Sequence, residues 1–256
     1  MSKKKARWRK LDNAAKLYSA ASNKKDTRVF RFYCELKEKV DSDVLQEALN
    51  QTIETFPTFL MVLRKGFFWH YLEPCNLRPI VKEEYKEPCS RLYIRDKKTL
   101  LFEVTYYKKR INFEVFHVLT DGTGATEFLK ELVKNYLYLA HKEEGLEQVA
   151  LLPEDMTVQD QEDDSFLKYY SKNQKRPKKR KLNAFQIRRK KKDGNHLHVH
   201  ESVVSVQAVL KRSRELGVSM TIFLTALFMM AINEEMSKMQ KKKPVVLMVP
   251  VNLRKF

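Results

Sequence analysis

The distribution of charge constrains the fold of this 256-residue chain most, because it divides the chain into parts. Residues 172–192 contain twelve Lys or Arg and no acidic residue, which is two thirds of the net charge of +18. Residues 154–164, just before them, contain six acidic residues. An acidic block followed by a basic block is typical of a connector. We therefore predict a charged linker over 154–195, between a first domain at 1–153 and a second at 196–256.

Strands and helices alternate before this linker. Phe30, Phe32, Cys34 and Leu36 recur at every second position, which is the period of a half-buried strand. A helix is expected to begin at a Ser42 cap and to end before the Phe56-Pro57 pair, because proline disfavours helix at the preceding residue. The remaining patterns predict a hairpin within 59–73, strands at 100–107 and 111–119, and a helix at 124–140.

The pattern begins again after the linker. A strand at 196–205 is expected, then a helix from Ser205 to Gly217, an apolar helix at 221–236 and a buried strand at 243–256. The whole chain is therefore predicted to belong to the mixed α/β class. Its last strand would need neighbours in a sheet, so we expect part of this second half to be missing or to come from another chain.

Composition excludes several classes of protein. Hydrophobic residues make up 43% of the chain, enough for a sizeable core. The three cysteines have unrelated spacings, which favours reduced thiols over a disulfide framework. The basic N-terminus lacks the apolar segment of a secretory signal. The longest apolar run, 222–232, is too short to span a bilayer and indicates a buried helix. These features predict a cytoplasmic protein without a membrane span.

One histidine has a sequence context that suits catalysis. His117 shares a face of the strand at 111–119 with Phe113 and Val115. Residues 120–124, Thr-Asp-Gly-Thr-Gly, follow it, and two glycines in three residues permit a tight backbone path. An imidazole with an ordinary pKa near ~6.5 suits proton abstraction at neutral pH. Such a base could deprotonate an alcohol, amine or thiol as it attacks a thioester.

A structural interpretation of the same residues stays open. A histidine at a strand end is commonly hydrogen-bonded to the backbone. Asp121, like Thr123, could cap the helix that follows. On spacing alone, the sequence does not separate this structural interpretation from the catalytic one.

Two further features suggest other functions. The basic stretch at 172–192 could bind nucleic acid or another polyanion, although a solvated connector explains it more simply. His196, His198 and His200 would share one face of a strand, a geometry compatible with Zn²⁺. No cysteine or acidic residue is positioned to complete that set, so we expect no metal. A non-catalytic binding or scaffold protein is the rival to an enzyme.

The motif at 116–122, FHVLTDG, resembles the HHxxxDG motif of the acyltransferase superfamily that includes chloramphenicol acetyltransferase and peptide-synthetase condensation domains. Phe116 stands at the first histidine, and His117 matches the second. Four flanking segments are similar to the bacterial alcohol acetyltransferase branch: RKLDNAAKLY near the start, FPTF at 56–59, VSMTIFLTALF at 218–228 and VPVNLRKF at the end. The resemblance covers nearly the whole chain, but only the N-terminal half of the family and the opening of its second half.

The resemblance implies a two-layer α/β sandwich of the chloramphenicol acetyltransferase type, with a nearly complete first half and a truncated second half. An acyl-CoA, for example acetyl-CoA, and a small-molecule alcohol would enter a tunnel between the halves. His117 would deprotonate the alcohol. Asp121 would pair with an arginine, for which Arg254 is the candidate, and Gly122 would let the backbone turn close to the tunnel. A second chain or a missing C-terminal half would complete the site.

Overall fold

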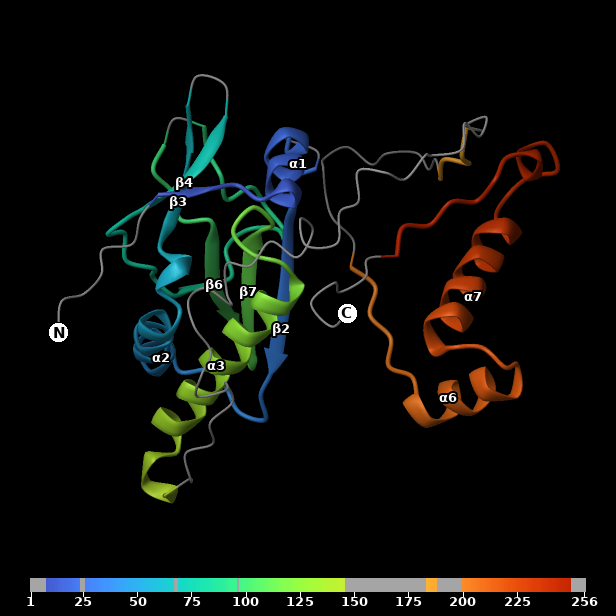
Figure 1. Cartoon of the computed structure of the whole chain (residues 1–256). Coiled ribbons are helices and arrows are strands. Elements are labelled where there is room, and N and C mark those ends of the chain that lie inside the picture. Colours follow the sequence, from blue (N-terminus) through green and yellow to red (C-terminus); the bar gives the residue numbers. More distant parts are fainter. Residues whose placement is uncertain are drawn as a thin grey trace. The chain divides into compact units, whose positions relative to one another are not determined.

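The computed structural model shows two compact units, Met1–Tyr170 with Phe256, and Ser171–Lys255 (Figure 1). The structure describes residues 8–23, 26–66, 69–95, 97–145, 183–187 and 199–249. Of the predicted linker at 154–195, only 183–187 belong to the described residues.

A four-stranded sheet organises the first unit. Its strands lie in the order β2 (Val29–Glu35), β7 (Arg110–Phe116), β6 (Phe102–Tyr107) and β5 (Lys82–Glu83). β7 pairs antiparallel with both β2 and β6, whereas β5 pairs parallel with β6. The strands expected from the alternating pattern are therefore confirmed, and the β6–β7 pair is a hairpin.

Two helices cover one face of this sheet, α2 (Ser42–Thr55) and α3 (Gly122–Ala140) (Figure 1). Phe113 of β7 stacks on Phe128 of α3 with ring centroids 4.6 Å apart. Phe102 of β6 also contacts Phe128, at 5.5 Å. Because side chains alternate along a strand, Phe102 and Val104 of β6 and Ile111, Phe113 and Val115 of β7 enter this core, and Phe30 and Phe32 of β2 pack against it.

The opposite face of the same sheet is polar, yet it is also buried. Thr105, Asn112 and Glu114 point to that side and are each at most 5% exposed. The chain between β5 and β6 crosses over this face, and its Cys89 N–H reaches the carboxylate of Glu114. The sheet therefore has an apolar core on one side and a buried polar cluster on the other.

The N-terminal residues join a second, three-stranded sheet in the order β1 (Arg9–Lys10), β4 (His70–Pro74) and β3 (Met61–Lys65). β3 and β4 form the hairpin predicted within 59–73. Between β1 and β2 lies α1 (Asn13–Ala21), and a short 3₁₀ turn, η1 (Pro57–Phe59), follows α2. Another, η2 (Lys142–Glu144), follows α3.

The predicted cap of α2 is wrong by one residue. Asp41, not Ser42, is the N-cap, and its Oδ1 accepts hydrogen bonds from the N–H groups of Asp43 and Val44. A carboxylate is favoured there because it also interacts with the positive end of the helix dipole. The predicted end of the helix before Phe56 is confirmed.

The described part of the second unit contains the two expected helices. α6 (Val206–Glu215) begins at the predicted Ser205 cap, whose Oγ accepts from the N–H of Ala208. Gly217 then adopts φ +65°, the left-handed conformation that favours glycine after a helix. α7 (Met220–Glu234) and the 3₁₀ turn η3 (Gln240–Lys242) follow.

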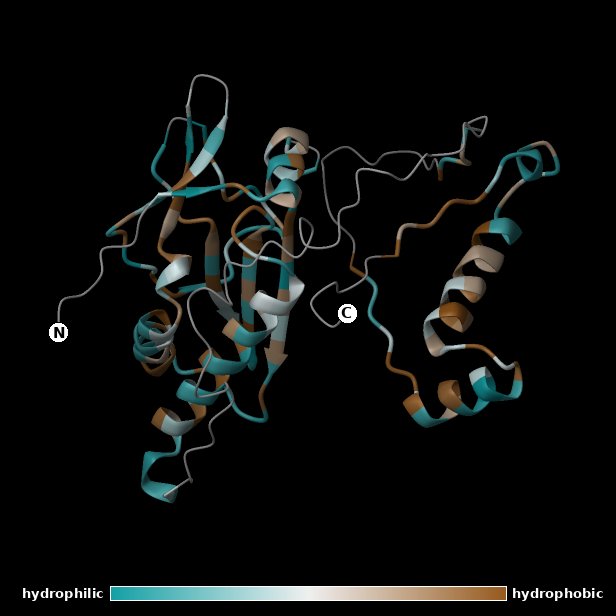
Figure 2. Cartoon of the chain, in the orientation of Figure 1, coloured by the Kyte–Doolittle hydropathy of each residue, from teal (hydrophilic) through white to brown (hydrophobic). Residues whose placement is uncertain are grey.

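Three expectations for this unit are wrong within the described residues. Residues 199–205 and 243–249 are not strands, because no neighbouring strand pairs with them there. α7 is not buried: Ile222, Phe228 and Met230 are each more than half exposed. Figure 2 shows hydrophobic residues along α7. A helix that is apolar around its circumference normally has a covering partner.

In the described part of the chain, no single helix has the length and apolar character needed to cross a bilayer. α6 and α7 satisfy that test only as a pair bent by 89°.

Candidate active site around His117

His117 extends the central strand pair by one residue. Its N–H donates a hydrogen bond to the carbonyl of Arg28 at 2.9 Å, just beyond the last register pair, Val29 and Phe116. The alternation along β7 carries the imidazole to the helix-covered side, with Phe113 and Val115. The main chain of His117 is therefore held by the sheet, although its side chain lies at the sheet's end.

Two aromatic rings enclose the imidazole of His117. Tyr18 of α1 stacks on it, with centroids 4.1 Å apart and planes 18° apart. Phe30 of β2 contacts it at 4.8 Å with an interplanar angle of 57°. Nδ1 is buried, and main-chain groups of His117 and Thr120 interact with the ring. The aromatic contacts restrict the plane of the ring, and the residue as a whole is half-buried.

Burial lowers the pKa of His117 below its usual value, because a charged imidazolium loses solvation there. Main-chain groups of His117 and Thr120 act in the opposite direction, as do the carboxylates of Asp121 and Asp12. Burial is the larger influence, so the ring is neutral at neutral pH. A neutral imidazole can accept a proton.

Asp121 caps α3, as the structural interpretation predicted. Its Oδ1 accepts a hydrogen bond from the N–H of Gly124 at 2.9 Å. The predicted partner Arg254 lies outside the described residues. The structure instead brings Arg9 to this loop, where its guanidinium donates to the carbonyl of Leu119 at 3.4 Å.

The glycine that the turn requires is Gly124 rather than Gly122. A Cβ at Gly122 would only touch Phe32, at 4.0 Å, and neither glycine has a positive φ. A Cβ at Gly124 would lie 2.2 Å from Oγ1 of Thr120, which is a clash. The close packing at the start of α3 therefore falls at Gly124, and Gly122 meets no comparable contact.

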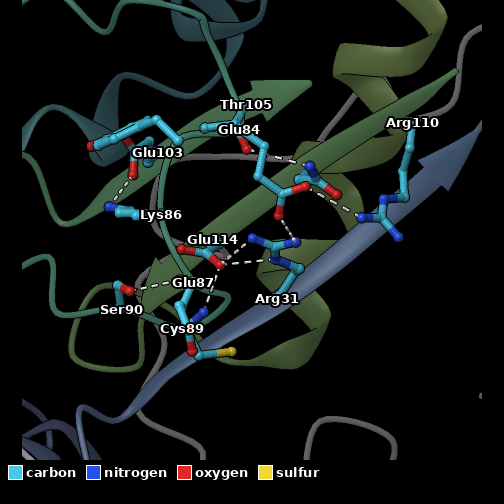
Figure 3. Close-up of polar contacts among 12 residues, drawn as sticks. Arg31, Glu84, Lys86, Glu87, Cys89, Ser90, Glu103, Thr105, Arg110 and Glu114 are labelled. Atoms are coloured by element: carbon cyan, nitrogen blue, oxygen red, sulfur yellow. Dashed lines mark hydrogen bonds and ion pairs between the residues drawn. The ribbon is translucent and has the colours of Figure 1, made fainter. Parts of the chain in front are cut away.

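A cluster of charged residues occupies the buried polar face of the sheet (Figure 3). Arg31 lies between two carboxylates, with Nε 2.8 Å from Glu114 and a terminal nitrogen 2.5 Å from Glu84. Arg110 also reaches Glu84, at 3.4 Å. Lys86 forms an ion pair with Glu103. Three cations and three anions therefore neutralise one another in this cluster.

This cluster is not among the sites predicted from the sequence, although the sequence carries a signal for it. In β7, Arg110, Asn112 and Glu114 alternate with apolar residues, so a second, polar face was readable. The partners Glu84 and Cys89 come from a segment without regular periodicity. Only the folded chain shows that this segment covers the face.

The remaining candidates do not gather at His117. Burial raises the pKa of the Cys34, Cys75 and Cys89 thiols, which keeps them protonated and poorly nucleophilic at neutral pH. His196 and His198 lie outside the described residues, as does most of 172–192. Across the described ranges, no group of three or more His, Cys, Asp or Glu side chains could hold a metal ion.

No protein-family model matches the chain, and no curated protein matches it. Solved structures similar to it include the starter condensation domain of the rhizomide synthetase RzmA, at 14% identity and a TM-score of 0.48, over 64% of this chain and 45% of that one. A mutant of that domain in complex with C8-CoA matches at 14% identity and 0.46, over 56% and 38%. The first condensation domain of the calcium-dependent antibiotic synthetase, in complex with a substrate analogue, matches at 15% identity and 0.43, over 57% and 40%. The chain thus spans less than half the length of these structures.

Proposed function

We propose that the first unit carries the general base of an acyl-CoA-dependent O-acyltransferase, and that His117 is this base. The observation that carries the proposal is the placement of the ring: the imidazole stacks on Tyr18 and contacts Phe30 at the end of β7. The lowering of its pKa by burial favours the neutral form. A general base must be unprotonated at the working pH and must have a fixed orientation. The ring of His117 meets both requirements.

In the proposed step, His117 carries one proton from the alcohol to the departing thiolate. Since Nδ1 is buried, we assign proton uptake to Nε2 of His117. Nε2 takes the hydroxyl proton as the alcohol oxygen forms a bond to the thioester carbonyl carbon. The carbon–sulfur bond then breaks, and the imidazolium returns the proton to the departing thiolate. The products are an ester and free CoA.

Nearby carboxylates support the charged intermediate of this step. Asp12 and Asp121 both favour the protonated form of His117 electrostatically. Each also caps a helix: Asp12 accepts from the N–H of Ala15 at 2.6 Å, and Asp121 from Gly124. Their positions are therefore fixed before the proton arrives. The match of 116–122 to the HHxxxDG motif supports the same role for His117.

Thiol release from acyl-CoA tests the proposal. The intact chain is supplied with acetyl-CoA or octanoyl-CoA and a panel of short and long primary alcohols, and free CoA is measured. Loss of a general base typically costs a factor of about 10² to 10⁴, so His117→Gln should reduce the rate by at least about 100-fold.

His70→Gln is the matched control for this assay. His70 lies in β4, and burial also lowers its pKa, but it is outside the proposed site. This variant should retain the wild-type rate. Equal rates for wild type and His117→Gln would contradict the proposal, as would wild-type protein that releases no CoA with any alcohol.

A further inference from the structure

Glu114 is the fully buried member of the charged cluster and lies in β7, the strand that His117 follows. It lies three residues before His117 in β7, points to the opposite face of the sheet, and is 2% exposed. Its Oε1 accepts from Nε of Arg31 at 2.8 Å and from the N–H of Cys89 at 2.7 Å (Figure 3). A buried carboxylate needs such partners to offset its lost hydration.

Cys89 is held in an unusual conformation by this contact. Its φ of +58° lies in the left-handed region, which is unfavourable for a residue with a side chain. While its N–H binds Glu114, its carbonyl accepts a hydrogen bond from Oγ1 of Thr27 at 2.7 Å. Both main-chain groups of Cys89 therefore serve as links between distant parts of the chain.

Thr27 passes the constraint to its neighbour Arg28. Oγ1 of Thr27 also accepts from the N–H of Val29 at 3.3 Å. The hydroxyl therefore links Val29, the residue after Arg28, to the carbonyl of Cys89. Arg28 has a φ of +55°, and its carbonyl receives the N–H of His117 at 2.9 Å. Among the described residues, three other than glycine have positive φ; two of them, Arg28 and Cys89, lie in this series of contacts.

We propose that Glu114 is a positioning residue for His117, acting through Cys89, Thr27 and the carbonyl of Arg28. The catalytic meaning of this role rests on the proposed function of His117. Two left-handed residues persist in a fold only when surrounding contacts over-determine them. The contacts with Glu114 and Thr27 hold Cys89 and Arg28 in these conformations. The carbonyl of Arg28 is thereby fixed as the acceptor for the N–H of His117.

A purely structural role for the cluster makes a different prediction. Loss of an ion pair or hydrogen bond would then lower global stability without a specific effect at His117. The proposed series of contacts, from Glu114 through Cys89 and Thr27 to Arg28, is called the relay. It predicts a local effect, which native-state hydrogen exchange of the His117 amide measures directly, because that amide donates to Arg28.

Thr27→Val removes the hydroxyl and keeps the shape of the side chain. We expect the His117 amide to exchange about tenfold faster, the effect of one hydrogen bond lost locally. The ring pKa of His117, followed by NMR titration, should rise toward its ordinary value as water gains access. In the thiol-release assay, kcat should fall while KM stays unchanged.

Thr105→Val is the matched control, since Thr105 lies on the same buried face but outside the relay. It should leave the exchange of the His117 amide at the wild-type rate. Glu114→Ala removes the acceptor of the Cys89 N–H and should speed exchange of the His117 amide about tenfold; a wild-type rate would overturn the role of Glu114. Glu114→Gln is the conservative variant: its amide oxygen can still accept from Cys89, so exchange should stay within a few-fold of wild type. If Glu114 acted through its negative charge alone, the His117 amide would exchange rapidly in Glu114→Gln.

Equal exchange of the His117 amide in Thr27→Val and Thr105→Val would overturn the relay. Rapid exchange in Glu114→Gln would overturn the role of its hydrogen bond to Cys89. Amide exchange does not depend on turnover, whereas the His117→Gln assay does. Failure of the relay and failure of the acyltransferase proposal are therefore distinguishable.

Discussion

At the residue scale, two opposing influences act on the protonation of His117. Burial between Tyr18 and Phe30 disfavours the charged imidazolium, whereas Asp12 and Asp121 favour it. A ring that was only buried would accept a proton with difficulty, and a ring that was only surrounded by carboxylates would already be protonated. The two influences together keep His117 neutral while leaving protonation accessible.

The lowered pKa of His117 also predicts a pH dependence of stability. The unfolded chain, with an ordinary histidine pKa near ~6.5, binds a proton more readily than the folded one. The stabilisation is therefore fully present above about pH 6.5 and is lost as pH falls through the lower folded pKa. Urea unfolding of wild type and His117→Gln across this range measures it: the stability difference between them should shift against wild type as pH falls. A constant difference would contradict the lowered pKa.

At the scale of elements, the sequence predicts the strands and helices in which apolar residues recur with a regular period. β2, β6, β7 and α3 follow from hydrophobic periodicity alone, because apolar residues recur along one face of each. The placement of α1 could not be predicted, since Tyr18 meets His117 across about one hundred residues of sequence. The relay through Cys89 was also beyond reach, because it depends on backbone conformations that no pattern of residue types encodes.

The start of α3 gives a prediction for two neighbouring glycines. Gly124→Ala should lower the free energy of unfolding by about 1–3 kcal/mol, because the new Cβ clashes with Oγ1 of Thr120. Gly122→Ala meets only an ordinary contact with Phe32 and should be neutral or stabilising by up to about 1 kcal/mol. Urea denaturation of both variants tests this, and equal midpoints would show that the close approach at Gly124 is unimportant.

At the scale of the whole molecule, the two units differ in how completely they bury their apolar residues. The buried cluster of the first unit extends from Leu11 to Tyr136, within Met1–Tyr170. In the second unit, α7 leaves large side chains exposed. The mixed α/β class predicted from sequence is confirmed by the sheets and helices of the first unit. The strands predicted at 196–205 and 243–256 are not found in their described residues, since periodicity does not reveal whether a pairing partner exists.

This difference predicts independent folding of the first unit. A fragment of residues 1–170 should unfold in one cooperative transition, because it contains its own core. A fragment of residues 171–255 should show helical circular dichroism without a cooperative thermal transition. A sharp transition for the second fragment, or none for the first, would contradict the assignment of the core.

The hydrogen bond between the N–H of His117 and the carbonyl of Arg28 has a consequence for the entropy of activation of the proposed reaction. The main chain of His117 continues β7, which is paired on both sides, so the position of its Cβ varies little. Only two side-chain torsions remain, and the stacked phenol of Tyr18 restricts both. The ordering that a reaction would otherwise demand in its transition state has thus already been completed during folding.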